Sequence, residues 1–210
     1  MDYRNGIKQF SNYKGFQGWV IAKAVYQRSK ISCAGIGQGC ILVKQRSRYA
    51  ILQSSWIKEN MEESVTITLM EPDREILVED AVHRGAEKFC KEGEGKFFPI
   101  GEIQDFVTDV KDDNAIHRTS HPIVPGLEIL EYVLSKIDTQ EVQVTQEVYL
   151  EIYFKHPLFA GRKVEIRWKD TTGTKYGKEW EFEGINDKVY FNGKLTMIDG
   201  EKRKNGIEHG

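Results

Sequence analysis

The sequence lacks the marks of three large classes of protein. Its 210 residues carry a formal net charge of only −2, so no excess of positive charge points to a nucleic-acid-binding protein. No apolar run approaches the roughly 20 residues that a membrane span requires. The first ten residues, MDYRNGIKQF, contain no apolar signal-peptide core. We therefore expect a cytoplasmic protein with no membrane or nucleic-acid partner.

Motifs for metals and nucleotide phosphates are also missing. Cys33, Cys40 and Cys90 have no CxxC spacing and no clustered histidines beside them, which argues against a metal site and predicts reduced thiols in the core. The glycine run at 35–39 has neither the spacing nor the following helix of a dinucleotide fingerprint. We interpret it as a loop or a β-bulge.

The second half of the chain predicts one helix followed by antiparallel strands. A length of 210 residues allows one large or two small domains with a substantial core. A helix over 126–137 would bury an apolar stripe, because its leucines recur at helical spacing. A short helix around Ile103, Phe106 and Val110 is expected before it. Alternating apolar residues predict strands near 148–154, 164–168, 180–182 and 189–197, with turns at Thr171–Thr174 and Asn186–Asp187.

The first half is interpreted as a repeat of the same order. Gly15–Arg28 reads as a helix that would bury Phe16 and Trp19. Strands are expected at 40–45, 48–57, 64–70 and 75–83, with a hairpin turn at Pro72–Asp73. The Gly- and Lys-rich stretch 91–101 is the expected junction. We predict two halves, 1–90 and 91–210, of which the first is a degenerate copy.

The segment DDNAIHRTSHPIVPGLEILE, at 112–131, carries the strongest functional signal. Asp112 and His117 lie five positions apart with Asn114 between them. Pro125–Gly126 opens the expected helix, and Glu131 lies in its second turn. Proton-transfer groups beside free helix N–H groups predict acid–base chemistry on a carbonyl compound, since such N–H groups can hold a developing oxyanion.

This segment resembles two related enzyme families. The pattern D-x-N-x-x-H followed by I-V-x-G is similar to the (R)-specific enoyl-CoA hydratases of the MaoC-like hot-dog family. The spacing of His117, Pro122, Pro125–Gly126 and Glu131 instead resembles the β-hydroxyacyl-ACP dehydratases. The chain departs from both patterns. The MaoC-like pattern usually has proline where this chain has Ala115, and a longer loop between the histidine and the helix. The second pattern lacks an aspartate like Asp112. The segment combines features of both patterns, so the resemblance is to the superfamily and does not single out one of the two families.

The resemblance implies an α+β hot-dog fold, in which a curved antiparallel sheet wraps one long helix. The repeated order of elements in the first half predicts a second, degenerate copy of this fold. It implies the interconversion of 3-hydroxyacyl and 2-enoyl thioesters of CoA or an acyl carrier protein, without a metal or other cofactor. Asp112 and His117 would activate water, Asn114 would orient the site, and the N–H of Gly126 would hold the thioester oxyanion. Whether Asp112 or Glu131 is the partner acid stays open. A homodimer is expected, because such folds usually complete their sites across an interface, unless the first half is the built-in partner.

Plainer structural explanations compete with each of these roles. His117 can be an ordinary loop histidine, and Asp112 can belong with Asp113 to a solvated acidic turn. Asn114 can shape that turn through its side chain, and Gly126 can be a common helix start after proline. Glu128 and Glu131, one turn apart, can form a solvated acidic helix face.

Three basic residues, Lys155, Arg162 and Lys163, are candidates for binding the phosphates of a pantetheine carrier, although solubility explains them equally well. His121 and His156 are interpreted as structural. Two other functions stay open: a hot-dog thioesterase, and an acyl-thioester-binding protein without turnover.

The first half is expected to hold no proton-transfer residues. Aligning Gly18 with Gly126 sets Arg4, Gln9 and Lys23 against Asp112, His117 and Glu131. None of these three is a good general base near neutral pH, because glutamine does not titrate and the other two are mostly protonated.

Overall fold

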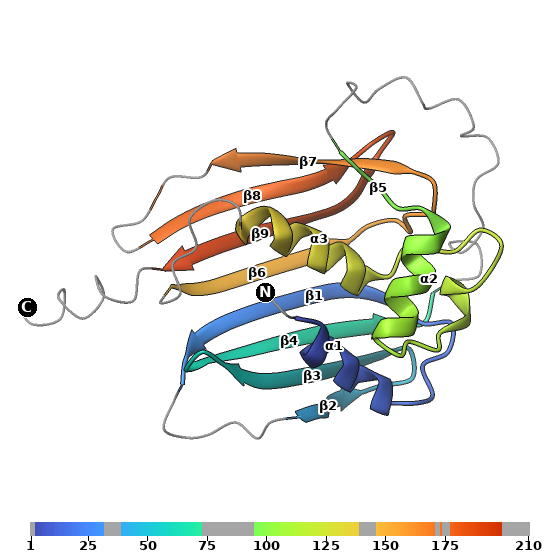
Figure 1. Cartoon of the computed structure of the whole chain (residues 1–210), viewed down its shortest axis with the longest axis horizontal. Coiled ribbons are helices and arrows are strands. Elements are labelled where there is room, and N and C mark those ends of the chain that lie inside the picture. Colours follow the sequence, from blue (N-terminus) through green and yellow to red (C-terminus); the bar gives the residue numbers. More distant parts are fainter. Residues whose placement is uncertain are drawn as a thin grey trace, which may run out of the picture.

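One nine-stranded antiparallel sheet organises the chain. The computed structural model describes residues 3–31, 39–72, 95–138, 146–170, 173 and 177–198. The strand order is β2-β3-β4-β1-β6-β9-β8-β7-β5. Strands of the first half fill one side of this sheet and strands of the second half fill the other, with β1 and β6 adjacent at the centre (Figure 1).

Each half contributes helical residues and four long strands, of which the last three form a meander and the first pairs with the last. The elements of the first half are α1 (Arg4–Lys8), the 3-10 helix η1 (Gln9–Asn12), β1 (Val20–Lys30), β2 (Gly39–Gln45), β3 (Tyr49–Lys58) and β4 (Met61–Met70). Those of the second half are β5 (Lys96–Phe97), α2 (Ile100–Asp109), the 3-10 helix η4 (Ala115–His117), α3 (Gly126–Asp138), β6 (Glu147–Phe154), β7 (Lys163–Asp170), β8 (Gly177–Ile185) and β9 (Val189–Ile198).

The strands form where apolar and polar residues alternate. In β4, Val65, Ile67 and Leu69 are buried while the threonines between them are partly exposed. This period of two places one face of the strand on the core. The β3–β4 hairpin turns at Glu59 and Asn60, whose φ angles of 50° and 61° are typical of the tight hairpin turn that matches strand twist.

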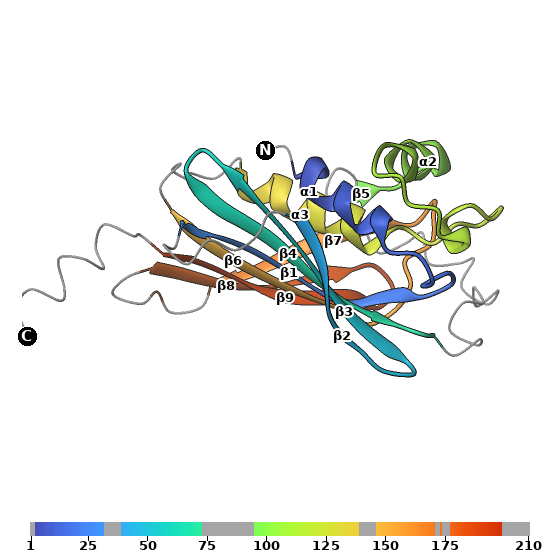
Figure 2. The same cartoon turned by 90° about the horizontal axis from the view of Figure 1, so that it is seen from below.

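The helices cover one face of the sheet (Figure 2). The buried stripe of α3 includes Leu127, Leu130, Leu134 and Ile137, as its spacing predicted. The short helices of the first half add Ile7 and Phe10 to the same core cluster. The core is therefore one continuous layer between the helices and the sheet.

The pairing of β1 with β6 joins the two halves. The ladder runs from Lys23 opposite Tyr153 to Arg28 opposite Val148. On its other side β1 pairs with β4, and β6 pairs with β9. Both central strands are thus hydrogen-bonded along both edges.

At one border of the sheet, a side chain covers part of the edge strand β2. The backbone N–H of Leu42 donates to the hydroxyl of Tyr13 at 2.9 Å, and this hydroxyl donates to the carbonyl of Cys40 at 3.3 Å. Next to these groups Ile41, Leu42 and Val43 have exposed side chains. The pairing with β3 shifts register between Leu42 and Lys44.

The predicted helix at Gly15–Arg28 is wrong. Residues 20–30 form strand β1, in which the buried residues Ala24, Tyr26 and Arg28 alternate with more exposed neighbours. The helical residues of this half lie earlier, at 4–12. A short apolar run fits both the helical period of 3.6 and the strand period of two. Here the strand forms because β1 pairs with β4 on one edge and with β6 on the other. The alignment of Gly18 with Gly126 therefore fails, because Arg4 and Gln9 lie in the helical segment and Lys23 lies in β1.

The other predicted elements agree with the structure where it describes them. The helix over 126–137, the short helix before Asp112 and the strands of the second half are confirmed. In the first half, the strands at 40–45, 48–57 and 64–70 correspond to β2, β3 and β4. The strand at 75–83 with its hairpin turn, most of the turn at Thr171–Thr174, residues 91–94 of the junction, Cys33 and Cys90 lie outside the described residues. The boundary between halves at 90/91 stays a prediction.

Deleting residues 1–90 is expected to leave no soluble monomer. The remaining chain would expose the edge of β6 and the apolar faces that α1 and β1 cover. We expect it to be insoluble or to pair with a second copy through β6, which size-exclusion chromatography with light scattering would reveal beside the full chain. A soluble, monomeric and folded 91–210 would contradict the dependence of the second half on the first.

Candidate functional site

The loop between α2 and η4 presents Asp112. Helix α2 ends at Asp109 with Val110 as its C-cap, and Lys111 then adopts a left-handed conformation with φ of 58°, which turns the chain. The N–H of Asp112 then donates to the carbonyl of Val107 at 2.8 Å. The carboxylate accepts from the N–H of Asn114 at 2.9 Å through Oδ1, and this Asx-type bond leaves Oδ2 for other partners.

The other carboxylate oxygen of Asp112 faces His117. Asp112 Oδ2 lies 3.6 Å from His117 Nε2. The second ring nitrogen, Nδ1, lies 2.7 Å from the carbonyl oxygen of Ile123. Since a carbonyl oxygen only accepts, Nδ1 carries the proton, and Nε2 of the neutral ring offers its lone pair toward Asp112.

Burial keeps this imidazole neutral. Only 7% of His117 is exposed. Desolvation lowers the pKa of His117 below its usual value, although the Asp112 carboxylate and the bond to Ile123 oppose the shift. A neutral imidazole with one directed lone pair is the form that accepts a proton.

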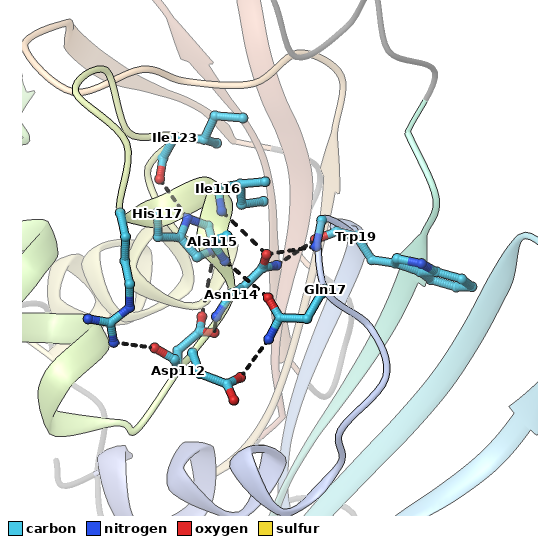
Figure 3. Close-up of polar contacts among 11 residues, drawn as sticks. Gln17, Trp19, Asp112, Asn114, Ala115, Ile116, His117 and Ile123 are labelled. Atoms are coloured by element: carbon cyan, nitrogen blue, oxygen red, sulfur yellow. Dashed lines mark hydrogen bonds and ion pairs between the residues drawn. The ribbon is translucent and has the colours of Figure 1, made fainter.

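Asn114 joins the loop to the first half of the chain (Figure 3). Its Oδ1 accepts from the N–H of Gly18 at 2.9 Å, and its Nδ2 donates to the carbonyl of Trp19 at 2.9 Å. Oδ1 also lies 3.5 Å from the N–H of Ile116. The amide is thus occupied by backbone groups, and this geometry favours a positioning role.

Asp112 and His117 lie at the wall of a cavity of about 520 Å³. Both halves line it, and its size lies within the range of small-molecule sites. The first half contributes mostly apolar side chains, among them Phe10, Leu52, Ile67 and Leu69. The second half supplies Asp112, His117 and the start of α3. The groups that could take part in acid–base chemistry therefore lie at one part of the cavity wall.

The first turn of α3 adds hydrogen-bond donors to this wall. Gly126 and Leu127 line the cavity, and their N–H groups make no hydrogen bond within the part of the chain that the structure describes. A Cβ on Gly126 would lie 3.1 Å from Ile21 Cβ and 3.3 Å from Phe154 Cζ. Only glycine fits here without displacing neighbours, and the helix dipole favours negative charge beside these donors.

Similarity to solved structures is found in shape and not in sequence. No family model and no curated protein sequence matches the chain. HtdX from Mycobacterium tuberculosis superposes with a TM-score of 0.58 at 12% identity, over 94% of this chain and 84% of that one. A MaoC-like dehydratase from Phytophthora capsici gives 0.54 at 11% identity, over 89% and 71%. A protein assigned as an oleoyl thioesterase from Lactobacillus plantarum gives 0.51 at 7% identity, over 86% and 75%.

The chain has the hot-dog fold. The sheet curves around α3, which is the long central helix of the second half, and the short helices α1 and η1 take the corresponding place in the first. The sequence therefore predicted the fold class correctly. At these identities the similarity establishes the fold alone.

Glu131, the other candidate acid on the hot-dog helix, lies away from the cavity. It is absent from the cavity lining, and its carboxylate accepts from Arg4 Nε at 2.8 Å and Arg4 Nη2 at 3.1 Å. Arg4 also contacts Asp109 at 3.1 Å, and Lys8 reaches the same aspartate at 2.9 Å. These ion pairs tie α1 to α2 and α3.

The burial of Glu128 rules out the alternative explanation of a solvated acidic helix face. It is 4% exposed, and its Oε2 has no hydrogen-bond partner among the described residues. Burial, with further contributions from Glu102 and Glu131, raises the pKa of Glu128 to about 8. No sequence pattern indicates this burial, because a charged residue one turn from another on a helix usually faces solvent.

The three candidate phosphate-binding residues are dispersed. Lys155 lines the cavity. Arg162 instead donates to the hydroxyl of Tyr190 at 3.1 Å and lies 3.5 Å from Asp187, and Lys163 belongs to β7 away from the lining.

Other residues at the wall carried no functional signal in the sequence. His156, interpreted as structural, lines the cavity, as do Gln17 and Trp19 from the first half, whereas His121 is exposed and does not. The described ranges contain no group of side chains suited to a metal ion. Nor do they contain a helix that is long and apolar enough to cross a membrane.

Glu128→Gln is expected to stabilise the protein in a pH-dependent way. The pKa of the carboxyl is about 8 in the folded chain against an ordinary 4.5, so the folded state binds the extra proton between these values and stability falls as pH rises. Glutamine mimics the protonated form. Thermal denaturation should therefore show a higher Tm for the variant at pH 8.5 and little difference at pH 4.5.

Glu131→Gln, one turn away, is the matched control. It breaks the ion pair with Arg4 and should not raise the Tm at pH 8.5. An equal Tm change for Glu128→Gln at both pH values would contradict the burial of an ionisable carboxyl.

Proposed function

We propose that the protein is a hydratase/dehydratase that interconverts 3-hydroxyacyl and 2-enoyl thioesters. One observation carries this proposal: a carboxylate and a neutral imidazole face each other 3.6 Å apart at the wall of an apolar cavity that also contains the free N–H groups of a helix start. The similarity in shape to a MaoC-like dehydratase supports it.

The Asp112–His117 pair suits the activation of water. Because His117 Nδ1 donates to the carbonyl of Ile123, Nε2 is an acceptor, and the Asp112 carboxylate is one as well. A water molecule that donates one proton to each would direct its oxygen lone pair outward. This geometry orients the nucleophile and prepares the removal of its proton.

In the hydration direction this water attacks C3 of the enoyl thioester. One of its protons passes to the Asp112–His117 pair while the new C–O bond forms. The electrons of the double bond move onto the thioester oxygen, where the N–H of Gly126 stabilises the charge. The pair then returns the proton to C2, so that the elements of water are added and the pair is regenerated. Dehydration follows the reverse course.

The substrate carrier is proposed to be CoA or an acyl carrier protein. The apolar residues of the first half would receive the acyl chain, and Lys155 is the candidate for contact with the carrier's phosphates, since it lies at the cavity wall. Of the other two cations, Arg162 already has an acidic partner. The first half would act as the built-in partner of the site, and pairing of two chains stays a prediction.

Hydration of crotonyl-CoA, followed by loss of enoyl absorbance, tests this proposal. His117→Ala should lower turnover by about 10²–10⁴, the usual contribution of general acid–base catalysis. Asp112→Asn, nearly isosteric, should be strongly impaired too. Glu131→Gln should keep most of the activity, because Glu131 lies outside the cavity lining.

Circular dichroism of each variant controls for folding. If Glu131→Gln were inactive and Asp112→Asn mild, the partner acid would be Glu131 and the assignment of Asp112 would be wrong. Near wild-type hydration by folded His117→Ala would refute the site.

The acid limb of the pH profile is expected below the usual histidine value. The pair must be unprotonated to accept a proton from water, and burial lowers the pKa of His117 from 6.5. The kcat/KM for hydration should thus stay high at pH 6.5 and fall only at lower pH. A limb centred above pH 6.5 in stopped-flow or steady-state measurements would show that another group limits the reaction.

The second candidate function is hydrolysis of the thioester. A carboxylate and an imidazole can also direct water to a carbonyl carbon, and the similarity in shape to a protein assigned as a thioesterase favours testing it. Release of free thiol from acyl-CoA, measured with a thiol reagent, would identify this activity. Binding of crotonyl-CoA without either product would instead identify an acyl-thioester-binding protein.

A further inference from the structure

A short segment of the first half lies across the loop that carries Asp112 and His117 (Figure 3). We call this segment, Lys14–Trp19, the strap. It follows the 3-10 helix η1 and leads into β1. Two of its residues, Gly15 and Gly18, have φ angles of 101° and 78°, which L side chains rarely adopt.

The strap binds three consecutive residues of the loop. Lys14 Nζ lies 2.8 Å from Asp113 Oδ2, and Gln17 Nε2 donates to Asp113 Oδ1 at 3.0 Å. Asn114 binds the backbone of Gly18 and Trp19, as described above. The N–H of Ala115 donates to Gln17 Oε1 at 3.2 Å.

Gln17 is the strap side chain that bridges the loop on both sides of Asn114. Its amide donates to Asp113 and accepts from Ala115, so both of its polar atoms are used. Gln17 and Lys14 are both exposed, but Lys14 contacts one loop residue, Asp113, whereas Gln17 contacts two, and a surface ion pair contributes little.

The bond from Ala115 to Gln17 lies at the start of the turn that ends with His117. Ala115 is the first residue of the three-residue helix η4. The first N–H groups of a helix have no partner inside it, and here Gln17 supplies one. In so short a turn, the orientation of the last residue depends directly on how the first is held.

We propose that Gln17 is a positioning residue for the Asp112–His117 pair. It acts through the loop, by fixing the first residue of η4 from outside, and it also lines the cavity. Its effect on turnover rests on the proposed function, whereas its effect on the environment of His117 does not.

The test begins with Gln17→Ala. Loss of the two hydrogen bonds of Gln17, of which only the one from Ala115 holds η4, is expected to lower kcat for crotonyl-CoA hydration about threefold to tenfold, which is the scale of one net hydrogen bond. Lys14→Ala, the matched control on the same strap, should keep kcat within about twofold. A loss in Gln17→Ala confined to KM would mean that Gln17 is only part of the cavity wall, and would overturn the proposal.

A second substitution separates positioning from general damage. Ala115→Pro removes the N–H that Gln17 binds and fixes φ at the first position of η4, where proline is favoured. The preceding Asn114 has φ of −66° and ψ of 119°, which is compatible with a following proline. In the Gln17→Ala background this change should restore most of the lost kcat. No restoration by a folded double variant would overturn the proposal.

A measurement without substrate distinguishes this proposal from the proposed reaction. Nuclear magnetic resonance titration of the histidines, with His117 assigned by His117→Ala, should show the pKa of His117 moving toward 6.5 in Gln17→Ala and unchanged in Lys14→Ala. If the wild-type protein does not hydrate crotonyl-CoA but His117 responds in this way, the reaction is wrong and the positioning role stands. An unchanged His117 titration in Gln17→Ala would overturn the positioning role, whatever the enzyme assay shows.

Discussion

The site depends on the backbone ladder between β1 and β6. This pairing sets the two halves side by side in one sheet, so that the residues immediately before β1 reach the loop before α3. Asn114 can bind Gly18 and Trp19 only because β1 begins at that place. The same ladder brings Ile21 against Gly126 and lets the core of the first half line the cavity. Without it the second half would keep its motif and lose one wall of its pocket.

Sequence patterns predicted those features of the fold that depend on residues close together in the chain. Asp112, Asn114, His117 and Gly126 lie within one short segment, and the structure brings Asp112 within 3.6 Å of His117, whereas their catalytic role stays a prediction. The spacing of the leucines likewise predicted the buried face of α3. The strand β1 was mistaken for a helix because its apolar run fits either period, and the choice is made by β4 and β6, which lie far away in the sequence. Gln17 contacts the loop at 113–115, and Arg4 contacts Glu131. Both contacts join segments that are distant in the sequence, so no spacing rule indicates them.

Two buried ionisable groups respond to burial in opposite directions. Desolvation lowers the pKa of His117 and raises the pKa of Glu128 to about 8. Near pH 7 both therefore exist mainly in the uncharged form. The charged groups that hold the helices together, such as Arg4 and Glu131, keep partial contact with solvent. The uncharged forms of His117 and Glu128 are thus buried, whereas the ion pairs between the helices lie at the partly exposed surface.

The hydroxyl of Tyr13 on β2 has a consequence for self-association. An edge strand with exposed Ile41 and Val43 is a template on which another chain can add a strand. Such an incoming strand needs free backbone groups, and here the N–H of Leu42 and the carbonyl of Cys40 are already bound to the phenol. The register shift beside Val43 further interrupts the edge. One aromatic side chain thereby leaves this border of the sheet with fewer free backbone groups to which a second chain could pair.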